Sequence, residues 1–448
     1  MKVSKILLSF LGIFCLIGVG SILPFRFQNI FLTKPTVKLG IDVLEERGFD
    51  VLQGKSIGVL TNQAGVNGRG DLTWKILKNT PGFDLKTIFA PVHGLDGKFM
   101  SLETFYNDEI DNIPIYSVFA SNSRPKNEWL RGLDAVVVDL QDIGIRYYNY
   151  WGFMVYMMAA CFENNIEVIV LDRPNPLGGH YIGGPAMNSE NTSIWGPIAD
   201  FPLFHGMTIG EIANYCKNSS EEIIAHKLLE TGVPYSGIKI SHETLKKGKL
   251  TVIPMEGWRR DMRWEDTGLK WVRTSPYIFN LQSVYEYAFT ALSALVALDY
   301  FDTCNFLKFE SSWSSWQHLH LFSSRYISSV LIMKYLNEEV FKNYSQYGFS
   351  LSARGDKGNF IEIEVKDIRK VKPALFGLAM LALSKKYTRF YVNSEDVYRF
   401  IGAHIGDNEL LQKLCAGGEE IDVSYFAKKW DNEAQNFIEK SKVFYFYE

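Results

Sequence analysis

The sequence lacks the short motifs that identify several large classes of protein. There is no Gly-x-Ser-x-Gly hydrolase elbow, and the glycines at positions 65, 68 and 70 do not have the spacing of a dinucleotide-binding loop. We therefore expect no cofactor. No two of the five cysteines are close enough in sequence to form a metal-binding knuckle, and no metal site is expected. The cysteines are Cys15, Cys161, Cys216, Cys304 and Cys415.

An excess of one charge is also missing. The net charge is −3 and no long basic run occurs, which argues against binding to nucleic acid. Apolar residues make up 47% of the 448 residues and charged residues 22%, so an ordinary globular chain with room for two domains is expected. Aromatic residues reach 14%, which fits either sugar-binding surfaces or an aromatic-rich core, and the core is the preferred interpretation. Free buried thiols are preferred over disulfides, because Cys161 falls on the buried face of an expected helix.

The N-terminus carries the one long apolar run. Lys2 and Lys5 precede an uncharged stretch from Ile6 to Leu23, and the next charge is Arg26. This pattern indicates a signal peptide or a signal anchor over residues 1–26. Either form would place the globular part outside the cytoplasm, periplasmic or membrane-anchored, with membrane contact only through this segment.

Strands and helices are expected to alternate from residue 40 onwards. Buried strands are predicted at 56–61, 85–90, 113–118, 135–140, 167–171 and 249–254, with helices between several of them. The Val run at 136–138 is typical of a parallel strand covered on both faces. The sequence thus predicts an α/β fold, with a Rossmann-like parallel sheet domain at 40–275.

The later part is expected to form a second, smaller α/β domain at 276–448. Helices are predicted at 285–298 and 373–384, and the aromatic stretch 312–335 is expected to be mostly helical. Strands are predicted at 349–352 and 359–365. Two helix starts are also predicted, with Asp71 and Thr208 as the capping residues.

Polar side chains follow four of the predicted strands at the point where each strand ends. In a parallel sheet these ends lie on one edge, where open α/β sheets bind ligands. A small-molecule site is therefore expected there. The competing interpretation is that the polar residues cap turns or form an internal ion-pair network that orders the loops. The candidate residues are Asn62, His93, Asp139, Gln141, Asp142, Arg146, Tyr147, Asp172, Arg173, Asn175 and His205.

Seven segments of the chain together have a recognisable pattern. They are residues 58–62 (GVLTN), 91–94 (PVHG), 138–148 (VDLQDIGIRYY), 171–179 (LDRPNPLGG), 205–211 (HGMTIGE), 252–258 (VIPMEGW) and 265–268 (EDTG). With these segments the chain resembles the exo-β-N-acetylmuramidase (NamZ-like) family, formerly a domain of unknown function. The resemblance covers most of residues 40–448 and is most specific before about residue 276. It implies a Rossmann-like larger domain, a smaller α/β domain and a cleft between them.

The resemblance also implies an activity and roles for residues. The expected reaction removes N-acetylmuramic acid from the non-reducing end of peptidoglycan fragments, so the expected partners are peptidoglycan-derived amino sugars. His93 would orient the substrate or a water, and Asp142 or Glu103 would supply the carboxylate. The other candidates named above, together with Trp258, would bind the sugar.

Two departures from the family pattern leave two hypotheses open. The family has Glu before the His-Gly pair, where this chain has Val92, and its Glu-Gly-Arg-Gly-Thr segment at the start of the second domain is missing here. Valine cannot transfer a proton, whereas glycoside hydrolysis usually needs two carboxyl groups. The chain is therefore either a glycosidase with a rearranged carboxylate pair or an inactive relative that still binds muramyl sugars or peptidoglycan.

Overall fold

The computed structural model describes most of the chain beyond residue 36. Residues Pro35–Glu448 form one compact unit, and the expected domain boundary near residue 275 stays a prediction. The expected N-terminal signal segment lies outside the described residues. The residues described are 37–99, 108–119, 123–193, 196–226, 237–290, 292, 308–309, 322–323, 328–342, 344–354, 360–387, 395–416 and 420–448.

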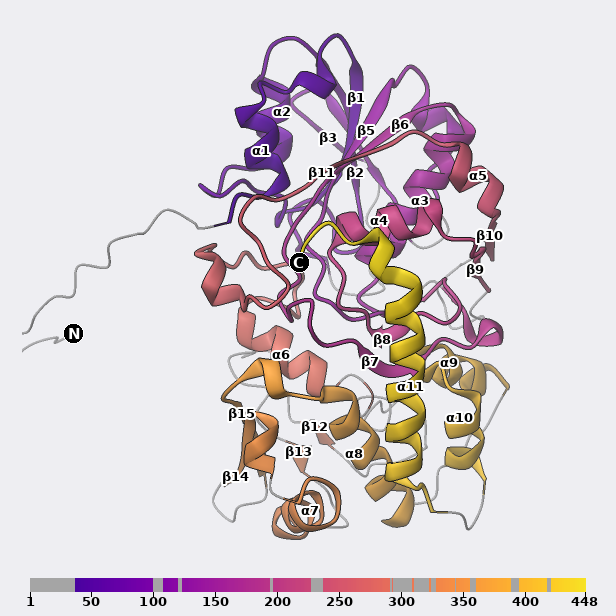
Figure 1. Cartoon of the computed structure of the whole chain (residues 1–448). Coiled ribbons are helices and arrows are strands. Elements are labelled where there is room, and N and C mark those ends of the chain that lie inside the picture. The colour runs from indigo at the N-terminus through magenta and orange to yellow at the C-terminus, as the bar shows by residue number, and fades with distance from the viewer. Residues whose placement is uncertain are drawn as a thin grey trace, which may run out of the picture. The chain divides into compact units, whose positions relative to one another are not determined.

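A seven-stranded, mainly parallel sheet organises the first part of the chain, as predicted (Figure 1). Its order is β11-β6-β5-β1-β2-β4-β3, and each neighbouring pair is parallel except β3 with β4. The strands are β1 (Ser56–Thr61), β2 (Asp84–Ala90), β3 (Asp108–Ile110), β4 (Ile113–Ser117), β5 (Ala135–Asp139), β6 (Glu167–Leu171) and β11 (Leu250–Ile253).

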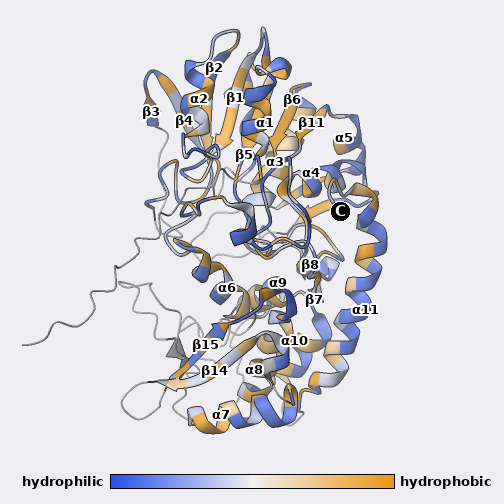
Figure 2. Ribbon diagram, turned by 60° about the vertical axis from the view of Figure 1, so that its left-hand side comes forward, coloured by the Kyte–Doolittle hydropathy of each residue, from blue (hydrophilic) through white to orange (hydrophobic). Residues whose placement is uncertain are grey.

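Both faces of this sheet are covered, which explains the continuous apolar runs in its strands. In β5, Val136 and Val138 pack into one hydrophobic cluster, while Ala135 and Val137 pack into another. The first cluster includes helices α3 (Tyr150–Glu163) and α4 (Ile209–Asn218), and the second includes α1 (Gly40–Glu46) and α2 (Thr73–Asn79). Since alternate side chains point to opposite faces, a strand buried on both sides must be apolar throughout. Figure 2 shows this hydrophobic colouring in β1 and β6.

One predicted helix start is confirmed and one is wrong. The Thr208 side chain accepts a hydrogen bond from the Glu211 amide and Glu211 accepts one from the Thr208 amide, so α4 begins with a capping box. Asp71 does not cap α2, because that helix begins at Thr73 after an extended Leu72. Asp71 instead accepts hydrogen bonds from the side chains of Asn67 and Arg69.

Small pairs of strands and one short helix extend the first part of the chain. The pair β7 (Gly183–Ala186) and β8 (Pro202–Phe204) is antiparallel, and so is the pair β9 (Ile223–Ala225) and β10 (Ile238–Ile240). Helix α5 (His242–Lys247) precedes β11. The buried thiols Cys161 and Cys216 are free, as predicted, and so is Cys415.

The later part contains an antiparallel sheet with helices, in the order β12-β13-β15-β14. Residues 322–323 form strand β13, so the helix expected over 312–335 is wrong there. An antiparallel partner in β15 satisfies the β13 backbone, and α7 begins only after residue 328. The elements are β12 (Lys308–Phe309), β13 (Phe322–Ser323), β14 (Phe349–Arg354), β15 (Phe360–Val365), α6 (Leu281–Thr290), α7 (Ser329–Tyr335), α8 (Pro373–Tyr387), α9 (Glu395–Ile405), α10 (Asn408–Cys415) and α11 (Val423–Ser441).

The chain end returns to the parallel sheet. Helix α11 packs against β7, and the C-terminus then lies beside α4 (Figure 1). The Phe446 amide donates to Glu211 Oε1 (3.0 Å), and the Tyr447 hydroxyl donates to Asp172 Oδ2 (2.5 Å). The last residues of the chain are therefore part of the structure around the ends of β6 and α4. No helix in the described part of the chain is long and apolar enough to cross a membrane.

Candidate functional site

The four predicted strand ends lie on the same edge of the sheet, which we call the carboxyl edge. Asn62 follows β1, His93 follows β2, Asp139 ends β5 and Asp172 follows β6. These strands are mutually parallel. The chain runs outwards from β1 through β2 to β4 and then returns to β5 on the other side of β1. Ligands of open α/β sheets bind at such a reversal of strand order.

Asp139 and Arg173 form a buried ion pair at this edge. Arg173 Nε lies 2.5 Å from Asp139 Oδ1, and its Nη2 lies 2.9 Å from Oδ2. The Thr73 hydroxyl also donates to Asp139 Oδ2, and Arg173 Nη2 donates to the Val66 carbonyl at 2.6 Å. Both charged side chains are almost fully buried. The pair joins the ends of β5 and β6 to the loop after β1, and this geometry favours the internal-network interpretation for these two residues.

Asp172 is the centre of a second buried network. Its carboxylate accepts hydrogen bonds from the Thr208 hydroxyl (2.8 Å), the Gly210 amide (2.7 Å), the Arg173 amide (2.9 Å) and the Tyr447 hydroxyl (2.5 Å). Burial raises the pKa of Asp172 to about 7, and the nearby Glu211 adds to this rise. The donors come from the start of α4 and from the C-terminal tail, so Asp172 links both to β6.

Arg146 is fully buried and contacts backbone carbonyls rather than a carboxylate. Nη1 donates to the carbonyls of Pro185 (2.7 Å) and Phe201 (2.8 Å), and Nη2 donates to those of His404 and Ile405. The last two carbonyls lie at the end of α9, where the helix dipole is negative and stabilises a cation. Burial lowers the pKa of Arg146 to about 10. This arginine connects the loop after β5 with the later part of the chain.

Asp142 keeps one oxygen without a partner. Oδ2 accepts a hydrogen bond from the Gly144 amide (2.6 Å) and lies 3.3 Å from His205 Nε2, whereas Oδ1 is buried and has no hydrogen-bond partner. His205 Nδ1 accepts a hydrogen bond from the Met207 amide (3.2 Å), so the proton of the neutral ring is on Nε2 and faces Asp142. Asp142 is thus oriented by the chain, and Oδ1 is left without a donor among the described residues.

Gln141, next to Asp142, has a similar arrangement. Its Nε2 donates to the carbonyls of Asp142 and Pro174, both at 2.8 Å, which fixes the amide group. Its Oε1 is buried and has no hydrogen-bond partner in the structure. A buried acceptor without a donor costs about 1–3 kcal/mol. A hydroxyl or amide group that donated to either oxygen would remove that cost.

His93 occupies a strained turn after β2. The Gly94 amide donates to the Pro91 carbonyl, and His93 has a φ of 76°, which is uncommon for a residue other than glycine. Its Nδ1 lies 2.6 Å from the Phe99 carbonyl, so Nδ1 carries the proton and Nε2 is left as an acceptor. Burial, with the nearby Arg273, lowers the pKa of His93. The ring is therefore neutral at neutral pH and offers Nε2 to a substrate or water.

The preceding residue, Val92, packs into the main hydrophobic cluster with 8% of its surface exposed. The position where the resemblance implies a glutamate therefore contributes to the core and presents no acid. Glu103, the other expected carboxylate, lies outside the described residues.

The remaining candidates are also buried. Asn175 Nδ2 donates to the Met207 carbonyl and its Oδ1 accepts from the Leu177 amide, which fixes the turn after β6. Asn62 Oδ1 accepts from the Ala64 amide, and its buried Nδ2 has no hydrogen-bond partner among the described residues. Tyr147 packs edge-on against Tyr287, and its hydroxyl has no hydrogen-bond partner. Trp258 packs edge-on against Tyr447, away from the group around Asp142 in sequence and in its contacts.

Residues 271–278, which we call the bridging segment, were not predicted as part of the site. Gln63 Nε2 donates to the Arg273 carbonyl (2.8 Å), and Arg273 Nη2 donates to the Gly97 carbonyl (3.0 Å). The Tyr148 and Tyr150 hydroxyls both donate to Thr274. The segment therefore contacts the loops after β1, β2 and β5. The segment has neither helical nor strand periodicity, so the sequence does not indicate that it belongs to the site. Only its contacts in the folded chain place it there.

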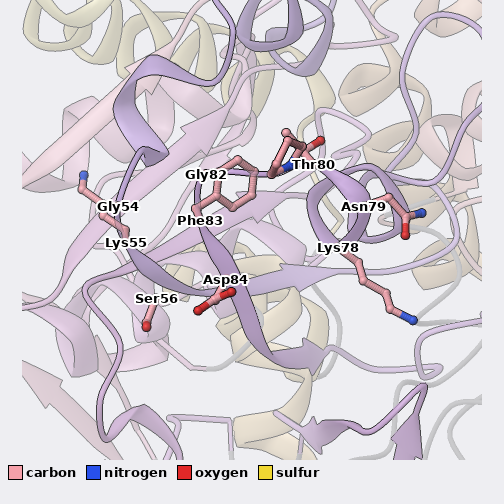
Figure 3. Close-up of a pocket in the computed structure, with 10 residues that line it drawn as sticks. Gly54, Lys55, Ser56, Lys78, Asn79, Thr80, Gly82, Phe83 and Asp84 are labelled. Carbon is pink, nitrogen blue, oxygen red and sulfur yellow. The ribbon is translucent and has the colours of Figure 1, made fainter.

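A depression of about 480 Å³ lies at the opposite, amino end of the sheet (Figure 3). It is lined by residues 54–56 before and within β1 and by residues 78–84 between α2 and β2. Its two lysines are already paired, Lys55 with Glu167 and Lys78 with Asp111, each at 2.7 Å, and they point away from each other. It therefore shares no residue with the predicted site. Within the described residues no group of three or more His, Cys, Asp or Glu side chains could hold a metal ion.

The fold and the carboxyl edge together define an α/β protein in which buried polar residues gather at a reversal of strand order. Residues 57–282, half of the chain, match the family described as "Exo-beta-N-acetylmuramidase NamZ, N-terminal". The chain belongs to this family.

One relative agrees with this assignment, and two solved structures share the fold. The chain is 36% identical over 267 residues to the peptidoglycan beta-N-acetylmuramidase NamZ of Bacillus subtilis, a match that spans 59% of this chain and 58% of that protein. Two crystal structures of DUF1343 family proteins from Bacteroides fragilis share the fold, with TM-scores of 0.75 and 0.60 and identities of 24% and 20%. They cover 93% and 92% of this chain, and 100% and 99% of their own.

The Asp139–Arg173 pair predicts a strong and non-additive effect on stability. Arg173→Met leaves a buried carboxylate unpaired and should lower the free energy of unfolding by about 3–5 kcal/mol. The double variant Asp139→Leu/Arg173→Met should lose clearly less than the sum of the two single variants. Urea unfolding measures all three, with Arg47→Ala as the control, because Arg47 and Asp50 form an exposed pair that contributes about 0–1 kcal/mol. Additive losses would contradict a paired role.

The raised pKa of Asp172 predicts a pH dependence of stability. Because the folded state binds this proton more tightly than the unfolded chain, the stabilisation is complete below about pH 4 and is lost as the pH rises towards 7. In this range the free energy of unfolding of the wild type, minus that of Asp172→Asn, should fall by up to about 1.4 kcal/mol for each pH unit. Urea unfolding of both proteins at several pH values tests this prediction. If the free energy of unfolding of the wild type minus that of the variant stays constant or grows with pH, the prediction is contradicted.

Proposed function

We propose that the chain is a muramidase-type glycoside hydrolase that releases N-acetylmuramic acid from the non-reducing end of peptidoglycan fragments. Family membership and the similarity to a peptidoglycan beta-N-acetylmuramidase support the substrate class. The observation that carries the proposal is the state of Asp142. Of the strand-end carboxylates, Asp139 and Asp172 are each fully engaged by donors from the chain, whereas Asp142 retains a free oxygen.

The chemistry assigns complementary roles to the residues at the carboxyl edge. Glycoside hydrolysis uses one carboxyl group as acid and a second as base or nucleophile. Asp142, held by the Gly144 amide and facing His205, supplies one of these groups. His93 accepts a hydrogen bond through Nε2 and positions the substrate or a water. Glu103 supplies the second carboxyl group in this proposal.

Val92 favours a second candidate function, which is recognition of muramyl sugars without turnover. Its side chain is buried among apolar neighbours, so no acid acts from that position. A protein of this kind would keep the polar groups of the edge as hydrogen-bond partners for the sugar. The two functions differ in turnover but share the ligand.

A chromogenic N-acetylmuramide separates the two functions. If the chain is a hydrolase, the wild type releases the chromophore, and Asp142→Asn lowers kcat by about 10²- to 10⁴-fold because the substitution removes the ionisable group. Asp84→Asn is the matched control, since Asp84 is exposed at the amino end of β2 and should retain the wild-type rate.

The other outcomes decide between the candidates. Binding of N-acetylmuramic acid without any release of chromophore would support the recognition function. If neither release of the chromophore nor binding of the sugar is detected, both candidate functions are contradicted. An Asp142→Asn variant that is folded and as active as the wild type would remove Asp142 from the mechanism.

We also propose that the chain is exported and that its globular part acts outside the cytoplasm. The apolar run after Lys2 and Lys5 supports this placement. Cell fractionation with a C-terminal tag should recover the protein from the periplasmic or membrane fraction, and deletion of residues 2–26 should retain it in the cytoplasm. Wild-type protein found in the cytoplasm would contradict export.

A further inference from the structure

Three arginines near the carboxyl edge are already engaged by the chain itself. Arg173 pairs with Asp139, and Arg146 donates to four backbone carbonyls. Arg260 Nη1 lies 2.9 Å from both oxygens of Glu211, and its Nη2 donates to the Gly206 carbonyl. Arg146 Nε has no partner in the described residues, but in all three arginines Nη2 already donates twice to the chain, so none can pair with both oxygens of an anionic ligand without breaking buried contacts. Arg146 and Arg173, two of the candidate sugar-binding residues, are therefore poorly placed to bind a carboxylate.

Arg273 in the bridging segment differs from these three arginines. It is exposed, and Nη2 of its side chain donates to the Gly97 carbonyl at 3.0 Å. Among the described residues, its Nε and Nη1 groups have no hydrogen-bond partner and no carboxylate lies within ion-pair distance. Since Nη2 carries two hydrogens and uses one, one fork of the guanidinium group, formed by Nη2 with either Nε or Nη1, keeps both of its donors.

The position of Arg273 is fixed beside the candidate site. The Gln63 side chain donates to its carbonyl, and the two tyrosines after β5 hold the neighbouring Thr274. In the same segment, the ring of Tyr277 packs edge-on against His93, with the centroids 5.7 Å apart. The positive charge of Arg273 is close enough to His93 to lower its pKa. A cation is therefore held next to His93 on a segment with little freedom to move.

We infer that Arg273 binds the carboxylate of the substrate and selects N-acetylmuramic acid over N-acetylglucosamine at the carboxyl edge. N-acetylmuramic acid differs from N-acetylglucosamine by an ether-linked lactyl group, which carries a carboxylate. The planar guanidinium fork of arginine pairs with both oxygens of a carboxylate, and Arg273 keeps adjacent donors for such a pair. This inference rests on the proposed function and adds to it the residue that distinguishes the two sugars.

Two chromogenic substrates that differ only in the lactyl group test the inference. Arg273→Ala should raise KM and lower kcat/KM for the N-acetylmuramide by about 10- to 100-fold, the loss expected for a charge-assisted hydrogen bond. It should leave kcat/KM for the N-acetylglucosaminide unchanged. Arg273→Lys should recover part of the loss, because it retains the charge but not the fork. If the protein does not turn over either substrate, NMR titrations with the two free sugars give Kd values for the wild type and the variants. The same differences between the two sugars are then expected in Kd.

Arg131→Ala is the matched control, since Arg131 is also exposed and follows the 3₁₀ turn Asn127–Leu130 rather than a strand of the candidate site. It should behave as the wild type with both sugars. If the wild type handles the muramide but Arg273→Ala affects both sugars equally, or neither, the assignment of Arg273 is overturned and the proposed function stands. If the wild type neither cleaves nor binds the muramide, the proposed function fails, and the inference fails with it.

Discussion

The buried pair between Asp139 and Arg173 is the interaction on which the carboxyl edge depends. An unpaired carboxylate or guanidinium at this depth would cost several kcal/mol, and the two groups neutralise each other through two short hydrogen bonds. Because Asp139 ends β5 and Arg173 follows β6, the pair fixes the points at which the chain leaves these two strands. The Val66 carbonyl and Thr73 attach the loop after β1 to the same pair. The positions of Asp142 and Asn62 follow from this arrangement.

The charged residues around this edge divide by whether the chain already satisfies them. Arg146, Arg260 and Asp172 connect segments that are distant in sequence, including the ends of α9 and of the whole chain. Apart from the buried Nε of Arg146, which has no partner in the described part of the chain, their charged groups are engaged by the chain, and they stabilise the fold. Asp142 and Arg273 retain free hydrogen-bonding groups, and the proposed chemistry therefore centres on these two residues.

Much of the fold could be predicted from sequence, because burial on two faces leaves a clear pattern. The apolar run in β5 and the capping residue Thr208 are local signals, and both were interpreted correctly. The stretch around Phe322 was interpreted as helix, since aromatic residues pack equally well in either element and the β13–β15 pairing is a tertiary contact. Asp71 failed as a cap for a related reason, because the loop around Asn67 uses its carboxylate.

The location of the candidate site could be predicted from the sequence, but the hydrogen-bond and ion-pair partners of each residue could not. Polar residues after parallel strands indicate the edge, yet the sequence does not reveal which of them neutralise one another. The pairing of Arg173 with Asp139 depends on two strands lying side by side, and the exposure of Arg273 depends on a segment without regular structure. These contacts join residues that are far apart in sequence, and only the folded chain identifies them.

The most direct test of this account is a crystal structure with N-acetylmuramic acid bound. We expect the sugar at the carboxyl edge, with a hydroxyl within hydrogen-bonding distance of Asp142 Oδ1 and the lactyl carboxylate against the guanidinium of Arg273. A sugar bound in the depression beside Lys55 and Lys78, at the amino end of the sheet, would contradict it.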